Sequence, residues 1–450
     1  MSEASAPFDL TLCGATVFTP SGRQSVDVGI RGDRIAALGE LADAPTRERL
    51  DLPGLTILPG VIDSQVHFRE PGHPDKEDLE TGTRAALLGG VTAIMEMPNT
   101  NPPTTTVQAL EDKLARAAGR ARVDHAFFAG ASDDNLDELG RIERTPGCAG
   151  VKIFMGSSTG SLLVSDDANV LRALRSGTRR VAIHAEDEPR LKERKKLAEA
   201  EGHPRAHPVW RDAETARRGT ERALTLARKA GRRVHILHVT SMDELPLLAA
   251  HKDIATFEIT PQHLTLVAPD CYERLGTFAQ MNPPIRDAVH RDALWGAVES
   301  GLVDVIGSDH APHTREEKAR TYPQSPSGMP GVQTLVPLML NHVHQRRLSL
   351  ERFVDLTSAG PARIYGLVGR GRIVPGAEAS LTIVDLEGRF TIASADQATR
   401  CGWTPFDGLE VTGKPVMTVL HGRVAMRDGE VLGEPLGRPL RFLDTLTPEA

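Results

Sequence analysis

The sequence predicts an α/β fold, a (β/α)8 TIM barrel that carries a small discontinuous β-sandwich domain formed by both chain ends. Between residues 58 and 365, short runs rich in β-branched residues alternate eight times with stretches of helical periodicity. On either side, the chain shows short alternating strands broken by Gly, Pro and Asp. A doubly wound sheet is disfavoured because no Gly-x-Gly-x-x-Gly follows the first strand of the middle region.

The two chain ends share the same strand-rich texture, which predicts that they pair into one domain. The strand-like runs are residues 8–18, 26–39, 378–386 and 415–432. Within the last run, Arg427-Asp428-Gly429 marks a hairpin. The predicted segments are residues 1–57 (N-terminal part of the β-domain), 58–365 ((β/α)8 barrel) and 366–450 (C-terminal part of the β-domain).

Strands and helices of the barrel are expected in regular alternation. The predicted strands lie in residues 56–68, 91–97, 125–130, 150–155, 179–186, 233–240, 254–260 and 303–310. Helical periodicity is clearest in residues 78–90, 107–119 and 211–231. The last of these ends on Gly231, where a helix C-cap belongs.

The composition is that of an ordinary globular chain and excludes several classes of function. Of 450 residues, 40% are hydrophobic and 25% are charged, with a net charge of −7. An acidic chain offers no basic face for nucleic acid, and an aromatic content of 4% argues against base-stacking platforms. The one notable total is 16 histidines, because His is the commonest metal ligand.

Nothing in the sequence indicates export or a membrane. The N-terminal MSEASAPFDL lacks the basic-then-apolar order of a signal peptide, and no window reaches 18 apolar residues. The four cysteines form no Cys-x-x-Cys pair, which favours a reducing compartment. We therefore expect a cytoplasmic protein without nucleic-acid or membrane partners.

Residues able to bind a metal ion occur where the predicted strands end. They are Gln65, His67, Asn99, Lys152, His184, His238, His263 and Asp309. One His at a strand end is more often structural than a ligand. Parallel barrel strands all end on one face, however, so these side chains are expected to converge on a single mouth.

The types of residue in this group suit zinc chemistry. Imidazoles and carboxylates bind Zn²⁺, and Asp309 could also accept the proton of an attacking water. A lysine within a strand is costly unless it is paired or neutralised. Lys152 is therefore either ion-paired or carboxylated by CO₂, which would make it an anionic ligand able to bridge two metal ions.

Eight motifs give the chain its resemblance to a known family. They are GVIDSQVHFREPG (60–72), MPNTNPPTTT (97–106), GVKIFMGSSTG (150–160), IHAEDE (183–188), LHVTS (237–241), ITPQHL (259–264), MNPPIR (281–286) and GSDHAPHTREEK (307–318). Together they resemble the dihydroorotases of the amidohydrolase superfamily. Residues 60–331 carry the motifs, and the strand-rich ends are similar to that family's flanking domain.

The resemblance implies a role for each matching residue. The implied ligands of a centre of one or two zinc ions are His67, Lys152 as carboxylysine, His184, His238 and Asp309. Asp309 also matches the general base and acid. The residues matching substrate-binding groups are Arg69, Asn99 and His313, for an exocyclic carboxylate, and Asn282, for the pyrimidine ring. A planar guanidinium suits a carboxylate because it binds bidentately.

One position departs from the family motif Asp-x-His-x-His, because Gln65 replaces its first histidine. An amide oxygen is a weaker zinc ligand than an imidazole nitrogen. Three outcomes are open: Gln65 binds metal through its oxygen, the first metal binds loosely, or the site holds one metal. A degenerate, inactive homologue is the remaining alternative.

Residues 314–333 lack helical or strand periodicity and directly follow the motif containing Asp309. They form either a mobile loop over the site or an ordinary surface connection.

These features predict zinc-dependent, reversible cyclisation of N-carbamoyl-L-aspartate to L-dihydroorotate in de novo pyrimidine biosynthesis. One alternative is another cyclic amidase: a hydantoinase, dihydropyrimidinase or allantoinase. The other is a non-catalytic scaffold that partners aspartate transcarbamoylase. The family resemblance also implies a homodimer.

Overall fold

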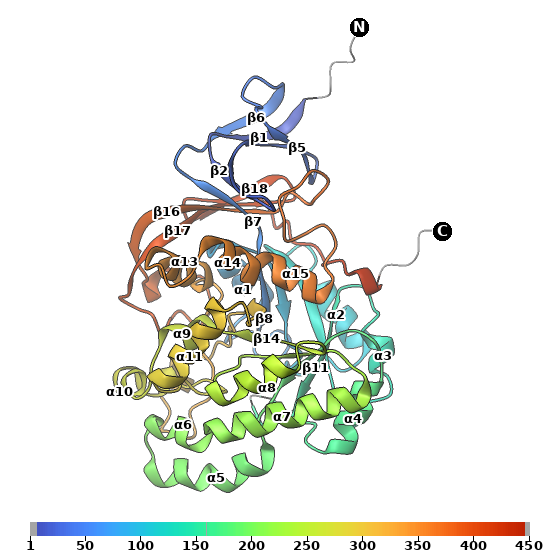
Figure 1. Cartoon of the computed structure of the whole chain (residues 1–450), viewed down its shortest axis with the longest axis vertical. Coiled ribbons are helices and arrows are strands. Elements are labelled where there is room, and N and C mark those ends of the chain that lie inside the picture. Colours follow the sequence, from blue (N-terminus) through green and yellow to red (C-terminus); the bar gives the residue numbers. More distant parts are fainter. Residues whose placement is uncertain (1–6, 159, 446–450) are drawn as a thin grey trace.

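Eight parallel strands form the centre of the computed structural model, which describes residues 7–158 and 160–445 (Figure 1). They are β8 (Val61–Val66), β9 (Val91–Glu96), β10 (Asp124–Gly130), β11 (Cys148–Phe154), β12 (Val181–His184), β13 (Val234–Ile236), β14 (Ala255–Ile259) and β15 (Val305–Ile306). Each pairs with the next in chain order. Beyond β15, His310 pairs in parallel with Val66 and so joins the two edges. The predicted (β/α)8 barrel is confirmed.

The barrel strands are nearly continuous apolar runs because both of their faces are buried. In β9, Ile94 belongs to the core between strands and helices, whereas its two neighbours Ala93 and Met95 belong to a second cluster. That second cluster also contains Phe128 and Tyr365 and fills the barrel interior. The alternation of strand side chains thus produces two separate apolar layers.

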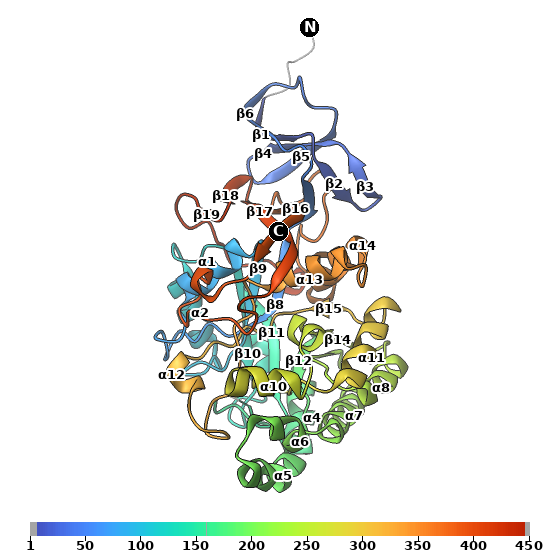
Figure 2. The ribbon, with the colours of Figure 1, turned by 90° about the vertical axis from the view of Figure 1, so that its left-hand side faces the viewer.

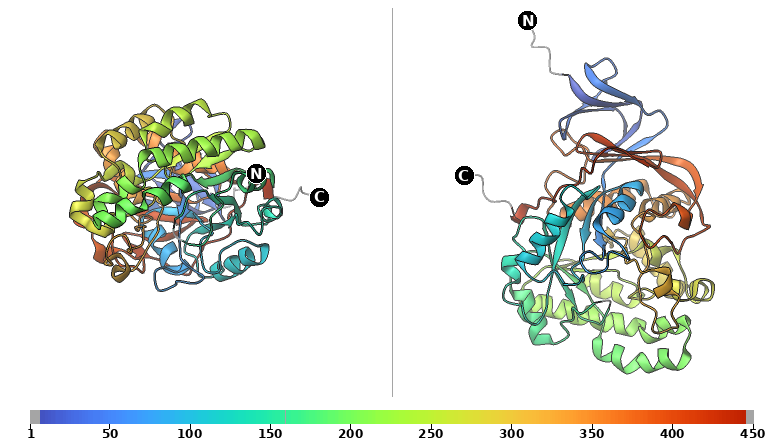
Figure 3. Two further views of the ribbon diagram at one scale, coloured as in Figure 1. Left: turned by 90° about the horizontal axis from the view of Figure 1, so that it is seen from below. Right: turned by 180° about the vertical axis from the view of Figure 1, so that it is seen from behind.

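Helices surround the strands, and Figures 2 and 3 show them around the outside of the barrel. The longer ones are α1 (Leu79–Leu88), α2 (Val107–Ala117), α4 (Asp167–Arg175), α5 (Glu188–Glu201), α7 (Ala213–Ala230), α11 (Ala288–Glu299) and α13 (Leu335–His344). The shorter ones are α3 (Leu139–Ile142), α6 (His207–Trp210), α8 (Leu245–Ala250), α9 (Pro261–Thr265), α10 (Asp270–Leu275), α12 (Arg315–Lys318), α14 (Leu350–Val354) and α15 (Gly360–Tyr365).

The helix predicted over residues 211–231 corresponds to α7. Asp212 caps its start by accepting a hydrogen bond from the Thr215 N–H, and Gly231 ends it with a φ of 67°. None of the helices within the described ranges is long and apolar enough to span a bilayer.

Strands from both chain ends build two further sheets at one end of the barrel (Figure 1). One has the order β5-β4-β1-β6, and the other has the order β19-β18-β17-β16-β7-β2-β3. The N-terminal strands are β1 (Phe8–Cys13), β2 (Thr16–Thr19), β3 (Gly22–Ser25), β4 (Asp27–Arg31), β5 (Arg34–Gly39), β6 (Thr46–Asp51) and β7 (Thr56–Pro59). The C-terminal strands are β16 (Leu381–Thr391), β17 (Glu410–Leu420), β18 (Arg423–Arg427) and β19 (Glu430–Val431).

Antiparallel pairing of β7 with β16 joins the two chain ends, and one apolar cluster contains residues from both. Leu12 and Val28 from the first end pack in this cluster with Ile383 and Val419 from the second. The predicted hairpin at Asp428-Gly429 is confirmed by the pairing of β18 with β19.

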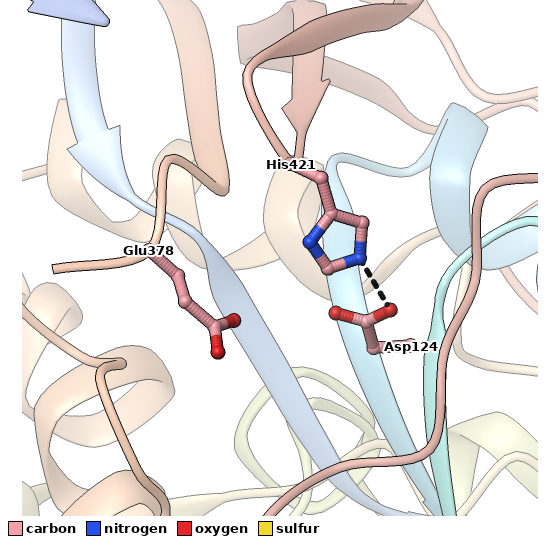
Figure 4. A group of neighbouring side chains, drawn as sticks. All are labelled: Asp124, Glu378 and His421. Carbon is pink, nitrogen blue, oxygen red and sulfur yellow. Dashed lines mark hydrogen bonds and ion pairs between the residues drawn. The ribbon is translucent and has the colours of Figure 1, made fainter. Parts of the chain in front are cut away.

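A buried group of charges joins the C-terminal region to the start of β10 (Figure 4). Asp124 accepts a hydrogen bond from His421 Nε2 at 2.9 Å and one from the Arg438 N–H at 2.6 Å. The Arg370 guanidinium pairs with Asp124 and, at 2.9 Å, with Glu378. One guanidinium therefore neutralises two carboxylates from different segments, the buried Asp124 and the half-buried Glu378.

We expect Arg370→Met to lower the free energy of unfolding by about 3 kcal/mol, because it leaves the buried carboxylate of Asp124 without its cation. Thermal and urea unfolding measure the loss. The matched control is Arg363→Met, whose guanidinium is 62% exposed and pairs only with Asp355, and it should change stability by less than about 0.5 kcal/mol. Equal stability of the two variants would contradict the role given to Arg370.

Candidate active site

The polar residues at the strand ends meet in a narrow cavity at the carboxyl-terminal mouth of the barrel. Its lining comprises Gln65, His67, Arg69, Asn99, Lys152, Phe154, Ser158, His184, His238, Asn282, Asp309, Ala311, Ser327 and Gly328. These include every predicted site residue except His313 and His263. The predicted convergence follows from the parallel strands, which all end on the same face.

The possible metal donors of the cavity form two close pairs. His67 Nε2 lies 3.1 Å from Asp309 Oδ1, and the same oxygen accepts a hydrogen bond from Gln65 Nε2 at 3.0 Å. Across the cavity, His184 Nδ1 lies 3.1 Å from His238 Nε2. His67 and Asp309 follow the two strands that meet where the barrel closes, and His184 and His238 follow the neighbouring strands β12 and β13. Strand pairing therefore determines both spacings.

Lys152 lies on β11 and is fully buried, and its Nζ has no hydrogen-bond partner in the described part of the chain. Nζ faces the Phe154 ring at 4.4 Å from the centroid. Burial lowers the pKa of Lys152 to about 7, although Asp309 and Glu258 oppose this effect. Lys152 is therefore not the ion-paired interior lysine that the sequence left open. Its amine is neutral in a substantial fraction of molecules near pH 7, and this is the form that adds CO₂.

Two predicted ligands hold strained backbone conformations. His238 has a φ of 38° and Asp309 has a φ of 45°, in the left-handed region that non-glycine residues rarely adopt. Both residues follow the last paired residue of their strands. Such strain concentrates at functional sites, where the surrounding structure holds side chains in place.

A buried carboxylate orients His184. Glu186 Oε2 lies 2.8 Å from His184 Nε2, so Nε2 carries the proton and Nδ1 presents its lone pair to His238. Burial raises the pKa of Glu186, but the Arg211 charge and hydrogen bonds from His184 and Arg211 outweigh it, leaving the pKa at about 2. The sequence analysis missed Glu186 and Arg211, although Glu186 lies within the motif IHAEDE.

Arg69 brings a buried positive charge to the cavity, on which Asp309, Glu96 and Glu317 act only from beyond ion-pair distance. It is 5% exposed, and no carboxylate of residues 7–158 or 160–445 forms an ion pair with it. Its Nε donates to the Pro312 carbonyl at 3.1 Å, and its Nη2 lies 3.3 Å from His313 Nε2. Burial lowers the pKa of Arg69 to about 10, so the guanidinium stays charged at neutral pH.

His313 lies behind Arg69 and outside the lining. Its Nε2 is 3.1 Å from the Ser327 carbonyl, and its Nδ1 is 3.4 Å from Lys76 Nζ. A neutral ring satisfies both contacts when Nε2–H donates and Nδ1 accepts. In this structure His313 therefore holds the Ser327 segment and does not line the cavity. Its protonated Nε2 cannot accept a hydrogen bond from Arg69, so the two side chains are only packed together.

Two further histidines hold the wall that contains Asn282. His207 Nε2 lies 3.0 Å from Asn282 Oδ1, and His263 Nε2 lies 3.1 Å from the Pro283 carbonyl. The other ring nitrogen of His263 contacts Thr260 Oγ1 at 2.7 Å, so both nitrogens have protein partners and His263 supports this wall from outside the cavity lining. His207 was missed because it is distant in sequence from every motif.

The donor set of the mouth fits a metal ion. Lys152 Nζ and Gln65 Oε1 are buried without hydrogen-bond partners among the described residues. Lone pairs of this kind are costly in a protein interior, and a bound cation offsets that cost. Three imidazoles with a carboxylate are donors that zinc prefers.

A second group, Asp124, Glu378 and His421, also has donor atoms within 4.8 Å of one another (Figure 4). It lies at the amino-terminal start of β10, opposite the mouth. Arg370 already pairs with both of its carboxylates, so a positive charge occupies the place a metal ion would take. The mouth is therefore the better candidate metal centre.

A (β/α)8 barrel with imidazoles, a carboxylate and a lysine gathered at its mouth defines a metal-dependent barrel hydrolase. The model described as "Amidohydrolase family" matches residues 56–425. The chain belongs to this amidohydrolase family and is a hydrolase, and members of the family typically depend on metal ions.

Comparison with individual proteins gives several similar relatives. A dihydroorotase of Halobacterium salinarum is 37% identical over 92% of this chain and 96% of its own length. An allantoinase of Deinococcus radiodurans is 33% identical over 96% of this chain and 98% of its own length. The solved structure of an L-hydantoinase from Arthrobacter aurescens superposes with a TM-score of 0.92 at 29% identity, covering 96% of this chain and 99% of that one.

We expect Gln65→His to raise the amount of zinc retained per chain, because an imidazole nitrogen binds zinc more strongly than an amide oxygen. Elemental analysis of both purified proteins after dialysis measures the stoichiometry. Gln262→His is the control, since Gln262 is also buried but does not line the cavity. Identical stoichiometry in wild type and Gln65→His would show that position 65 does not control metal binding.

Proposed function

We propose that this protein is a dihydroorotase, which interconverts N-carbamoyl-L-aspartate and L-dihydroorotate by forming or hydrolysing a cyclic amide. The proposal depends most on Arg69, a buried guanidinium that lines the cavity without an acidic partner among the described residues. A buried charge of this kind is costly unless a ligand supplies the opposite charge. The exocyclic carboxylate of dihydroorotate matches that requirement.

The neighbouring residues support the same substrate. Asn99 and Asn282 line the cavity beside Arg69 and offer amide groups for hydrogen bonds. A guanidinium binds a carboxylate through two parallel hydrogen bonds, so it fixes orientation as well as charge. His313 packs behind Arg69 and holds the Ser327 segment, so its expected contact with the carboxylate stays a prediction.

We propose that the mouth holds one or two zinc ions, with Lys152 carboxylated. The proposed ligands are His67, Lys152, His184, His238 and Asp309. When bound, zinc supplies a Lewis acid that polarises the amide carbonyl and makes water more acidic. The unpartnered Nζ of Lys152 supports the carboxylation, because CO₂ would convert an isolated amine into an anionic donor.

Asp309 is the proposed proton carrier. In hydrolysis it would accept a proton from the attacking water and deliver it to the leaving amide nitrogen. Hydrogen bonds from Gln65 and contact with His67 are both made through Oδ1, which fixes the carboxylate within the cavity. Burial of Asp309 at 6% exposure keeps competing solvent away.

A second candidate is hydrolysis of a neutral cyclic amide, since relatives named allantoinase and L-hydantoinase are similar over most of the chain. Hydantoin and allantoin have no carboxylate to pair with Arg69. A neutral substrate would leave that charge uncompensated in the complex, which favours dihydroorotate.

Other expectations from the sequence stay predictions. They are the homodimer, partnership with aspartate transcarbamoylase, the cytoplasmic location and the segment boundaries at residues 57/58 and 365/366.

Purified protein supplied with zinc and bicarbonate should contain bound zinc and hydrolyse L-dihydroorotate, measured by the loss of its ultraviolet absorbance. A chelator should abolish turnover, and zinc should restore it, because water alone is a poor nucleophile at neutral pH. Absence of both zinc and turnover would favour the non-catalytic scaffold. Turnover of hydantoin or allantoin alone would favour the second candidate.

Arg69→Ala should raise the KM for L-dihydroorotate by about 100-fold, because a charged hydrogen-bonded pair in a buried site is worth a few kcal/mol. Arg69→Lys should recover only part of the loss, since an ammonium keeps the charge but not the planar fork. Steady-state kinetics of the three proteins test this. Unchanged kinetics in Arg69→Ala would overturn the assignment of dihydroorotate.

A further inference from the structure

Lys318 is a buried cation that the proposed mechanism does not use. It ends α12, has no measurable exposure, and lies 5.9 Å from the centroid of the Trp403 ring. Burial alone lowers the pKa of Lys318 to about 7, with no contribution from an acidic group. Burying a lysine side chain without an acidic partner costs free energy, so its hydrogen bonds must offset that cost.

The Lys318 ammonium group binds two main-chain carbonyls from separate segments. Nζ donates to the Gln280 carbonyl at 3.2 Å and to the Pro326 carbonyl at 2.9 Å. The Gln280 carbonyl also accepts from the Gly328 N–H at 2.8 Å, and the Ser325 hydroxyl donates to the Gln280 side chain. Lys318 therefore lies at the centre of the junction between residues 277–282 and 325–328.

Each segment held by Lys318 provides a wall of the active-site cavity. Asn282 follows Gln280 by two residues, and Ser327 and Gly328 directly follow Pro326. The distance between these walls determines the width of the cavity at this point. Lys318 itself does not line the cavity, so it can affect a substrate only through the segments it holds.

The connection depends on N–H donors rather than on charge. A neutral amine still has two N–H groups, which is the number needed for the two carbonyls. The junction therefore persists in both protonation states, and a side chain of similar length that donates N–H bonds should partly replace lysine.

We propose that Lys318 is a positioning residue that sets the spacing between the Asn282 wall and the Ser327–Gly328 wall, and so sets the affinity for the cyclic amide. The inference rests on the proposed function only for the choice of substrate. Walls that contact substrate equally in the ground and transition states affect KM more than kcat.

The test compares Lys318→Met with Lys318→Gln, two side chains of similar length of which only glutamine donates N–H bonds. We expect Lys318→Met to raise KM about 10-fold with kcat within about 3-fold of wild type, and Lys318→Gln to recover much of the affinity. KM is measured with whichever cyclic amide wild type hydrolyses. If the wild-type protein does not hydrolyse dihydroorotate, the result counts against the proposed function and not against this inference.

The matched control is Arg179→Met. Arg179 is 3% exposed and likewise binds main-chain carbonyls, those of Glu143, Cys148 and Ala149, near the opposite end of the barrel. Both Arg179→Met and Lys318→Met should lower Tm, because each removes buried hydrogen bonds. Only Lys318→Met should change KM. Equal KM in Lys318→Met and wild type, or an equal KM rise in Arg179→Met, would overturn the inference. If Lys318→Met does not fold, Lys318→Leu, which also lacks N–H donors, takes its place, and an unchanged KM in that variant would overturn the inference.

Discussion

Closure of the barrel at the end of β15 is the constraint on which the active site depends. The His67 N–H donates to the His310 carbonyl at 2.7 Å, and Val66 pairs with His310. This pairing brings the first and last strands together and places Asp309 beside His67. The remaining donors arrive on strands between these two edges, so a shift of register at the closure would separate the ligands without changing any of them.

Buried positive charge distinguishes the mouth from the rest of this acidic chain. Arg69, Lys152 and Lys318 are all buried near the cavity, and burial lowers the pKa of each. Elsewhere, buried cations such as Lys113 and Arg370 pair with carboxylates. Arg69 lines the cavity and makes no ion pair among the described residues, so a chain with net charge −7 has a local positive charge where an anionic substrate would bind.

The main features of fold and site could be predicted because they follow from local periodicity and strand ends. Alternation of strand and helix patterns predicts the barrel, and parallel strands place their terminal residues together. Long-range supporting contacts leave no comparable pattern. Arg211 reaches Glu186 and His207 reaches Asn282 from a region with no motif, while His313 turns away from the cavity because Ser327 and Lys76 satisfy its nitrogens. Such partners depend on how loops fold back, which no sequence spacing specifies.

The side chain of Gln65 retains the capacity of a ligand even though it replaces a histidine. A carboxylate only accepts hydrogen bonds, so the Asp309 contact at 3.0 Å must be made by the amide nitrogen of Gln65. The amide oxygen then points elsewhere and is buried without a donor among the described residues. An unsatisfied buried acceptor costs about 1–3 kcal/mol, and a cation at the mouth would remove that cost. Glutamine in place of histidine at position 65 therefore weakens one metal donor. The side chain still lines the cavity and still binds Asp309. A decaying site would be expected to lose both of these properties.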